Sequence, residues 1–306
     1  MIEVKTEIKK YLKYCSLEKK LSKHTLKAYR IDLAQFIAFK PDISISKEDL
    51  TKYIQYLHKT YKPKTIKRKI ATLKAFVHYL YYKDIIEFNP FDKIDTSFKE
   101  PLRLPHTIPE NIIHQLLTAS YQNILTAATT HQKLVSVRNT AIIELLFATG
   151  ARISEICSLK INNIDFASKT VRIFGKGAKE RILQIENSDV IAILMKYLIL
   201  IDDSTQPNSY LFQNNRHNRI SEQSVRTIIR NLEKQIAAPL HITPHMFRHS
   251  VATLLLEEDV DIRYIQRILG HSSITTTQIY TLVTSSKQRE ILRTKHPRNK
   301  IHITQY

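Results

Sequence analysis

The sequence predicts a mainly α-helical protein with a small β-sheet in the second of two domains. At 306 residues the chain is longer than a usual single domain, so two domains are the default expectation. Apolar residues recur at helical spacing along much of the chain. A strand pattern is confined to one pair, Thr170–Phe174 and Arg181–Ile185, on either side of a glycine-containing turn.

The first domain, residues 1–98, is predicted to be a small helical bundle. Ser22 is expected to cap a helix that runs to Phe39, and the Ser46-Lys-Glu-Asp49 pattern resembles a capping box before a second helix. A third helix is predicted over Lys64–Tyr82, because apolar residues follow helical spacing there: Ile66, Ile70, Leu73, Val77 and Leu80.

A proline-rich connector is predicted to separate the two domains. Asn89-Pro90 ends the bundle, and residues 95–109 contain Pro101, Pro105 and Pro109, which disfavour a continuous helix. We therefore expect a linker over residues 99–108 and a second domain over 109–306.

The second domain is predicted to be α+β. Helices are expected over Pro109–Tyr121 and Val137–Thr149, with a polar stretch between them. The strand pair follows, joined by the turn Gly175-Lys176-Gly177-Ala178. Four more helices are predicted, over Asp189–Asp202, Glu222–Ala237, His245–Glu258 and Asp261–Leu269.

Both halves of the chain are basic. The sequence holds 47 Lys and Arg against 28 Asp and Glu, a net charge of +19; residues 1–98 account for 21 against 11, and the rest for 26 against 17. Such a field favours a polyanionic partner, and nucleic acid is the natural one. Charged residues interrupt every apolar run well before membrane-spanning length, so no membrane partner is expected. Two cysteines are too few for a disulfide framework, which favours the reducing cytoplasm.

Two basic stripes lie on predicted helices of the first domain. The spacing of each places its residues on one helix face. A solvated surface is the simpler explanation of either stripe alone, but two stripes in a basic domain favour phosphate contact. The stripes are Lys20, Lys23, Lys27 and Arg30, and Lys64, Lys67, Lys74 and His78.

Arg152 follows a predicted helix end. Gly150 would close one helix in a left-handed cap, and Arg152 would open the next. Glu155, three residues later, could share a face with Arg152 and orient it. An isolated arginine after a helix cap is more often an ordinary surface residue, so this pair gains meaning only with the motifs that follow.

His245 and Arg248 form a second motif. Pro244 favours a helix start, and the i, i+3 spacing then places the imidazole and the guanidinium on one face. With Arg152, Arg248 could bind the non-bridging oxygens of one phosphate. A capped helix with a solvated His and Arg is the alternative.

Tyr280 lies nine residues after His271, which follows a helix end at Leu269-Gly270. A phenol with a pKa near ~10 is a poor nucleophile at neutral pH unless cations favour the phenolate or polarise a phosphate beside it. Lys176, at the tip of the predicted hairpin, could bind phosphate or give a proton to a departing 5′-oxygen. Sequence-level reasoning leaves both roles open.

The order of these motifs resembles the tyrosine recombinase (phage integrase) family, and most closely its Xer-like and simple integrase members. The resemblance covers nearly the whole chain. Its matching stretches are HTLKAYRIDLAQFIAF at 24–39, ATGARISEICSLKINNIDF at 148–166, RIFGKGAKERILQI at 172–185 and ITPHMFRHSVATLLLEEDVDIRYIQRILGHSSITTTQIY at 242–280. It implies a helical core-binding (SAM-like) domain and an α+β catalytic domain that clamp double-stranded DNA at specific recombination sites, with four protomers on two sites.

The resemblance also implies roles for individual residues. By this resemblance Tyr280 is the nucleophile, and Arg152 and Arg248 are the phosphate clamp. Lys176 is the general acid. His245 and His271 assist proton transfer and bind the phosphate, and Glu155 is a supporting residue. Neither metal nor other cofactor is implied. The chain departs from the family pattern at Thr281-Leu282-Val283, in a longer 121–136 segment and in the tail from Lys295 to Tyr306. The basic segment 284–306 is expected to dock on a neighbouring protomer.

Three other functions compete with site-specific recombination. A type IB topoisomerase would use the same phosphotyrosyl chemistry but reseal the original strands, and a catalytically dead DNA-binding protein would give no covalent product. A metal site of His245, His249 and His271 is disfavoured, because no carboxylate or thiolate completes the set at a recognisable spacing.

Overall fold

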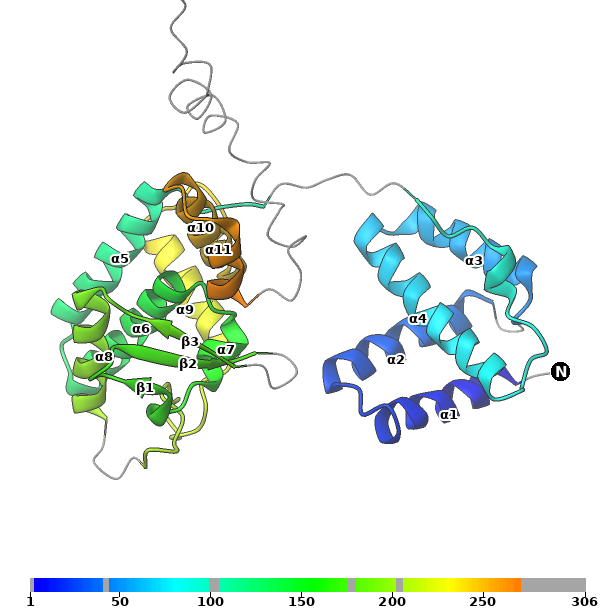
Figure 1. Ribbon diagram of the computed structural model, residues 1–306, viewed down its shortest axis with the longest axis horizontal. Helices are drawn as coiled ribbons and strands as arrows, with labels where there is room; N and C mark the ends of the chain where they lie inside the picture. The colour runs from blue at the N-terminus through cyan, green and yellow to red at the C-terminus, as the bar shows by residue number, and fades with distance from the viewer. Residues whose placement is uncertain (1–2, 41–43, 99–104, 176–179, 202–205, 271–306) are drawn as a thin grey trace, which may run out of the picture. The chain divides into compact units, whose positions relative to one another are not determined.

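A computed structural model describes residues 3–40, 44–98, 105–175, 180–201 and 206–270. The chain divides into two compact units, Met1–Leu102 and Arg103–Tyr306 (Figure 1). Within these described ranges, the first unit contains only helices, and the second combines helices with one small antiparallel sheet. The predicted fold class, mainly α with a small sheet in the second part, is confirmed.

The first unit is a four-helix arrangement followed by a short 3-10 turn at Pro90–Lys93. Its helices are α1 (Val4–Leu17), α2 (Lys23–Phe39), α3 (Lys47–Thr60) and α4 (Pro63–Tyr82). The predicted caps of α2 and α3 are present, since Ser22 accepts from the Thr25 amide and Ser46 from the Asp49 amide, each at 3.2 Å. Helix α1 was not predicted from the sequence.

The core of the first unit is apolar and aromatic. Fully buried side chains from three of its helices meet there, and Tyr53 packs edge-on against Phe36 at 5.0 Å between ring centroids. The fully buried residues of α2, α3 and α4 are Leu33, Phe36, Leu50, Tyr53, Leu57, Leu73, Phe76, Val77 and Leu80. This packing fixes the helices that carry the two basic stripes.

The second unit begins with α5 (Glu110–Leu125), α6 (Thr130–Thr149) and α7 (Ile153–Ser158). A 3-10 turn at Ile161–Asn163 leads into β1 (Ile164–Asp165), β2 (Thr170–Phe174) and β3 (Glu180–Gln184). The chain then forms α8 (Ser188–Leu200), α9 (Glu222–Gln235), α10 (Pro244–Glu257) and α11 (Ile262–Leu269).

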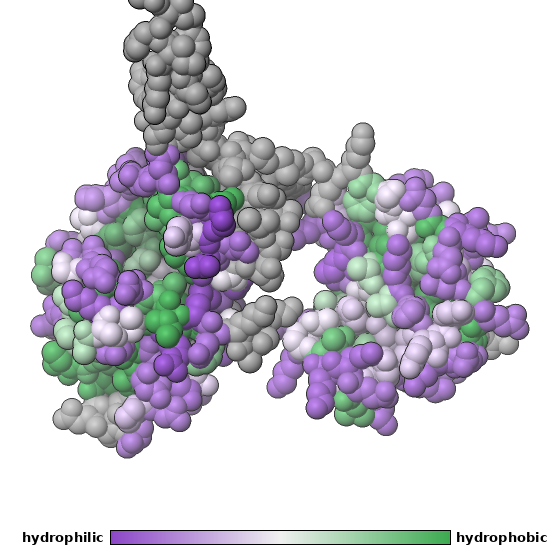
Figure 2. All heavy atoms as spheres, in the orientation of Figure 1, coloured by the Kyte–Doolittle hydropathy of each residue, from purple (hydrophilic) through white to green (hydrophobic). Residues whose placement is uncertain are grey.

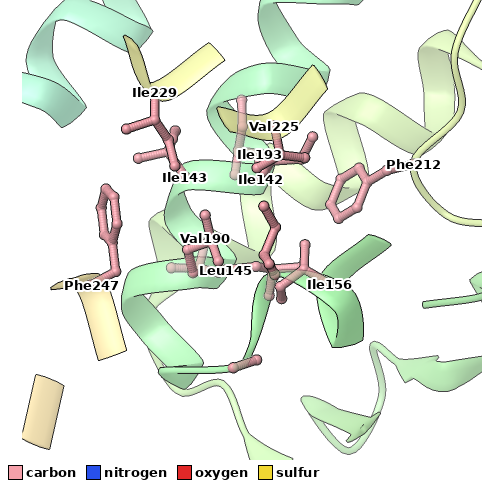
Figure 3. Packing of buried hydrophobic residues seen from close by; sticks show 14 of the residues in the cluster. Ile142, Ile143, Leu145, Ile156, Val190, Ile193, Phe212, Val225, Ile229 and Phe247 are labelled. Carbon is pink, nitrogen blue, oxygen red and sulfur yellow. The ribbon is translucent and has the colours of Figure 1, made fainter. Parts of the chain in front are cut away.

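Helix α6 occupies the middle of the second unit and packs against α5, α8, α9 and α10. Ile142, Ile143 and Leu145 of α6 are fully buried. Figure 3 shows them among Val190 and Ile193 of α8, Val225 and Ile229 of α9, and Phe247 of α10. Because α6 ends at the turn that carries Arg152, this packing also fixes the position of that turn.

The observed bounds of α5 and α6 differ from the predicted ones. The helix begins at Thr130 rather than Val137, and α5 extends to Leu125 rather than Tyr121. A capping box explains the earlier start, because Thr129 Oγ1 accepts from the Gln132 amide at 3.1 Å and Gln132 Oε1 accepts from the Thr129 amide at 3.2 Å. The first turn of α6 is polar and exposed, so the hydrophobic pattern did not reveal it.

The sheet has the order β1-β2-β3, with both pairs antiparallel. The predicted pair is confirmed, with Arg172 opposite Ile182, although β3 is displaced by one residue from the predicted range. β2 buries Val171 and Ile173, whereas β3 turns Arg181 inward and leaves Ile182 58% exposed. The turn at 176–179 lies outside the described residues.

Polar residues cover most of the visible surface of each unit (Figure 2). Among the residues that the structure describes, no helix is long and apolar enough to cross a membrane.

Candidate active site

The turn between α6 and α7 is built around Gly150. Its φ of +56° lies in the left-handed region, as predicted for a helix cap. A Cβ at this position would lie 2.6 Å from Leu269 Cδ2, so the turn also approaches the end of α11 closely. Glycine therefore satisfies both the backbone conformation and the packing, and the chain emerges at Arg152, the N-cap of α7.

Arg152 and Glu155 form the contact that their spacing predicts. Arg152 Nη1 donates to Glu155 Oε1 at 2.8 Å, and the Arg152 amide donates to Glu155 Oε2 at 2.9 Å. The Glu155 side chain is only 4% exposed, whereas that of Arg152 is 37% exposed. The carboxylate thus holds one side of the guanidinium while the side chain still reaches solvent.

Arg181 of β3 joins the same carboxylate, and sequence analysis missed it. Arg181 Nη2 lies 2.7 Å from Glu155 Oε2, and Nη1 lies 3.3 Å from Oε1. Its Nε donates to the Ile268 carbonyl at 2.9 Å. The sequence feature that could have revealed Arg181 is the reversed alternation of β3, in which a charged residue takes the inward position and its apolar neighbour Ile182 faces outward.

Arg248 of α10 links the two backbone segments around this cluster. Its guanidinium donates to the Gly150 carbonyl at 2.9 Å and to the Leu269 carbonyl at 2.7 Å, and the residue is 4% exposed. Carbonyls at a helix C-terminus have no partner within the helix, so a cation there is favourable. Arg248 thereby joins the Arg152 turn to the end of α11.

His245 and His249 occupy the first turns of α10. His245 is exposed, whereas Arg248, three residues later, is buried. Burial, together with the smaller effects of the charges of His245, Arg248 and His106, lowers the pKa of His249 to about 4. His249 is therefore neutral at pH 7.

Opposing effects act on the pKa of Glu155. Burial raises it, but hydrogen bonds and charge from Arg181 and Arg152 outweigh burial and hold the pKa below the ordinary value of 4.5. Glu155 is therefore ionised at neutral pH. Two guanidiniums share the Glu155 carboxylate, and Arg248 adds a third at the neighbouring Gly150 and Leu269 carbonyls, so the cluster is net positive and suits binding of an oxyanion such as phosphate.

The chain is similar to known proteins over nearly its whole length. The model of the phage integrase family matches residues 115–287, and that of the phage integrase N-terminal SAM-like domain matches residues 8–84. A tyrosine recombinase of Agathobacter rectalis is 50% identical over 305 residues, which cover 99% of this chain and 100% of that protein. The chain belongs to the phage integrase family. This assignment confirms the predicted resemblance and the predicted enzyme class, a tyrosine-type site-specific recombinase.

Other relatives of this phage integrase family member extend over both units. Tyrosine recombinase XerC of Anoxybacillus flavithermus is 32% identical over 300 residues, covering 94% of this chain and 96% of that protein. The solved structure of XerH site-specific recombinase bound to a palindromic difH substrate has a TM-score of 0.76 at 20% identity, covering 94% and 83% of the two chains. At this identity the similarity to XerH shows only that the two chains share a fold.

Three predicted site residues of this family member lie outside the described residues: Lys176, His271 and Tyr280. The same holds for Thr281-Leu282-Val283 and for the tail. Within the described ranges, no group of three or more His, Cys, Asp or Glu side chains is arranged to hold a metal ion. The alternative metal site also involves His271, which falls outside those ranges.

The basic stripes of the first unit are exposed on α2 and α4 and just before α2. This applies to all seven predicted DNA contacts: Lys20, Lys23, Lys27, Arg30, Lys64, Lys67 and Lys74. Lys74 also has partners within its own unit, since its Nζ lies 2.6 Å from Thr96 Oγ1 and 5.6 Å from the centroid of the Phe91 ring.

Proposed function

We propose that the chain is a site-specific DNA recombinase that cleaves and rejoins strands through a 3′-phosphotyrosyl intermediate, without metal or ATP. The observation that carries this proposal is the cluster of Arg152, Glu155 and Arg248. Arg248 connects the Arg152 turn to the last turn of α11, eleven residues before the proposed nucleophile Tyr280.

The positive cluster supports attack at phosphorus. In the proposed step the Tyr280 oxygen bonds to the scissile phosphate, the bond from phosphorus to the 5′-oxygen breaks, and a 5′-hydroxyl is released. Arg152 and Arg248 meet the charge that develops on the non-bridging oxygens, with His245 and His271 as further hydrogen-bond donors. Fixed cationic side chains thus perform the electrostatic role that metal ions have in other phosphoryl transfers.

Proton transfer completes the proposed cycle. The phenol passes its proton to His245 or His271 as it attacks, and Lys176 gives a proton to the departing 5′-oxygen. Attack by the 5′-hydroxyl of a partner strand on the phosphotyrosyl link then restores the phenol and forms a new phosphodiester. The ester conserves the bond energy, so strand exchange needs no nucleotide.

The partners of this reaction are proposed from the exposed basic residues and from the relatives. We assign Lys20, Lys23, Lys27, Arg30, Lys64, Lys67 and Lys74 to contacts with the phosphates of double-stranded DNA. XerH, which shares this fold, was solved bound to a difH substrate, and by analogy we propose a specific DNA site here. We further propose cytoplasmic action by a tetramer on two sites, with exchange of the basic tail 284–306 between protomers.

The deciding experiment traps the covalent intermediate. Covalent complexes formed on genomic DNA are stopped with detergent and sequenced to find the site, and a nicked duplex with that sequence then serves as suicide substrate in EDTA. Wild type should accumulate a protein–DNA adduct and Tyr280→Phe should form none. Tyr264→Phe, at an exposed tyrosine of α11, is the matched control and should react normally. Equal adduct from wild type and Tyr280→Phe would reject Tyr280 as nucleophile.

A second assay separates recombination from the alternatives. A recombinase joins DNA between two sites, a type IB topoisomerase only relaxes supercoils, and a catalytically dead protein binds without an adduct. We expect joined products from wild type, and relaxation without joining would favour the topoisomerase.

A further inference from the structure

Arg181 takes an unusual position for a charged side chain on a small sheet. It points inward from β3 and its side chain is 12% exposed, whereas the next residue, Ile182, is 58% exposed. Exchanging these positions would bury more apolar surface, so the observed pattern sacrifices hydrophobic burial. An arginine is kept in such a position only where its guanidinium is well paired.

The partners of Arg181 belong to two separate elements. Two of its nitrogens contact the Glu155 carboxylate of α7 at 2.7 and 3.3 Å, and its Nε binds the Ile268 carbonyl of α11 at 2.9 Å. A Cβ on Gly270 would lie 2.9 Å from Arg181 Nη1, so the α11 cap lies directly against the guanidinium. Arg181 therefore joins α7, β3 and the end of α11.

Sharing of the Glu155 carboxylate has an electrostatic consequence. Each of its oxygens accepts one hydrogen bond from Arg152 and one from Arg181. With Arg181 absent, the carboxylate could turn to form a bidentate pair with Arg152 alone, which would neutralise that guanidinium and change its direction. Two arginines on one carboxylate hold Arg152 in place and preserve positive charge at the site.

We propose that Arg181 is a positioning residue for strand cleavage, which acts through Glu155 to orient Arg152 towards the scissile phosphate. This role rests on the proposed function. It goes beyond the phosphate clamp itself, because Arg181 binds the carboxylate and the α11 backbone rather than the reacting atoms.

The first test measures single-turnover adduct formation on the nicked substrate with Arg181→Met and Arg181→Lys. Loss of a residue that orients a metal ligand typically costs about 10- to 100-fold, and by analogy we expect a loss of this order for Arg181→Met. Binding to the same intact duplex should change less than about twofold, because orientation affects the transition state more than ground-state binding. Arg181→Lys should recover little, since an ammonium cannot reproduce the planar fork.

Two control variants separate positioning from other effects. Arg226→Met removes an arginine that binds Glu222 at 3.0 Å on the surface of α9, and it should retain wild-type adduct rates. Ile193→Ala removes apolar contacts in the core of the same unit, and its lower unfolding temperature calibrates the effect of stability. If Ile193→Ala loses adduct formation as severely as Arg181→Met at equal destabilisation, the positioning role is rejected.

A sulfur-substituted substrate identifies the path of the effect. Sulfur in place of the bridging 5′-oxygen gives a leaving group that needs no proton, so it should rescue Lys176→Ala but not Arg181→Met. Rescue of Arg181→Met would overturn the proposal by placing its effect on leaving-group protonation.

A double variant tests whether Arg181 acts through Glu155. Combining Arg181→Met with Glu155→Gln should reduce adduct formation little more than Glu155→Gln alone, and full additivity of the two losses would also overturn the proposal. No adduct from wild type would instead reject the proposed function, and this role with it.

Discussion

His249 lies on the helix that carries His245 and Arg248, and it is partly buried beside them. Burial and the charges of His245, Arg248 and His106 lower its pKa to about 4. A neutral imidazole next to a cationic site limits repulsion between like charges. Its protonation should therefore cost folding free energy as the medium becomes acidic.

The pH dependence of stability follows from this shift. Between the unfolded pKa of 6.5 and the folded value of about 4, the unfolded chain binds a proton that the folded chain does not, so stability falls as pH falls. From pH 7 to pH 5 this residue should cost about 2 kcal/mol. Urea unfolding at both pH values should show a smaller loss in His249→Gln than in wild type. His114→Gln, at an exposed position of α5, is the control, and parallel losses in wild type and His249→Gln would contradict the assignment.

The ionisation of Glu155 also makes stability depend on pH, in a lower pH range than the ionisation of His249 does. Its folded pKa lies below the ordinary value of 4.5, so its contribution to stability is complete above that value and is lost as pH falls through the folded pKa. Glu155→Gln should therefore flatten the acid limb of the stability curve below about pH 4.5. Calorimetry from pH 5 to pH 3 checks this, and an unchanged acid limb in the variant would contradict it.

Site contacts were predictable from sequence only where they are local. The three-residue spacing of Arg152 and Glu155 predicted their contact, which the structure contains. Arg181 reaches the same carboxylate from 26 residues away, and Arg248 reaches the Gly150 carbonyl from 98 residues away. Such pairs depend on how the sheet and helices pack, and local spacing carries no information about them.

At the scale of elements, strong periodicity and caps predicted structure well. Ser22 and the apolar spacing of α4 located two helices of the first unit, and Gly150 marked the end of α6. Two strands of the sheet were predicted, but β1 has only two residues and too little pattern to be recognised. Helix α1 was missed although Val4, Ile8, Tyr11 and Cys15 follow helical spacing, because four lysines and one glutamate are interspersed among them.

A buried ionic network joins α2 to α4 and supports both basic stripes. Asp32 is 1% and the Lys69 side chain 2% exposed, and Lys69 Nζ lies 3.0 Å from Asp32 Oδ1. Arg68 and Thr72 also bind the Asp32 carboxylate, and Lys69 contacts Gln35. On α4 the network residues lie between the exposed Lys67 and Lys74, and on α2 they follow Arg30.

Removing one partner of this network should destabilise the first unit. Lys69→Met leaves a buried carboxylate with fewer donors, and breaking such a pair costs about 3 kcal/mol. Replacing both partners, as in Asp32→Leu with Lys69→Met, should recover part of that loss because neither charge remains to be desolvated. Urea unfolding measures each variant. Arg226→Met, which removes a solvent-exposed pair with Glu222 on α9, should have little effect, and an equal loss there would contradict the role of burial.

At the scale of the whole molecule, positive charge is spread over both parts of the chain. The net charge is +19, and residues 1–98 and 99–306 each hold an excess of Lys and Arg. Counterions released from DNA by these side chains favour binding to any duplex, whereas specificity needs contacts with bases or with DNA shape. Salt dependence therefore measures the proposed phosphate contacts without knowledge of the target site.

The stripe on α2 should contribute measurably to that salt dependence. Lys23 and Lys27 are exposed and one helical turn apart, so both can reach the same DNA backbone. In binding of the full chain to a 30-base-pair duplex of arbitrary sequence, each phosphate contact adds about 0.9 to the slope of log K against log salt concentration. Lys23→Ala with Lys27→Ala should therefore reduce the slope by about 2. Lys52→Ala with Lys59→Ala removes the same charge from exposed positions on α3, where we assign no phosphate contact. If both double variants reduce the slope equally, net charge rather than the α2 stripe governs binding.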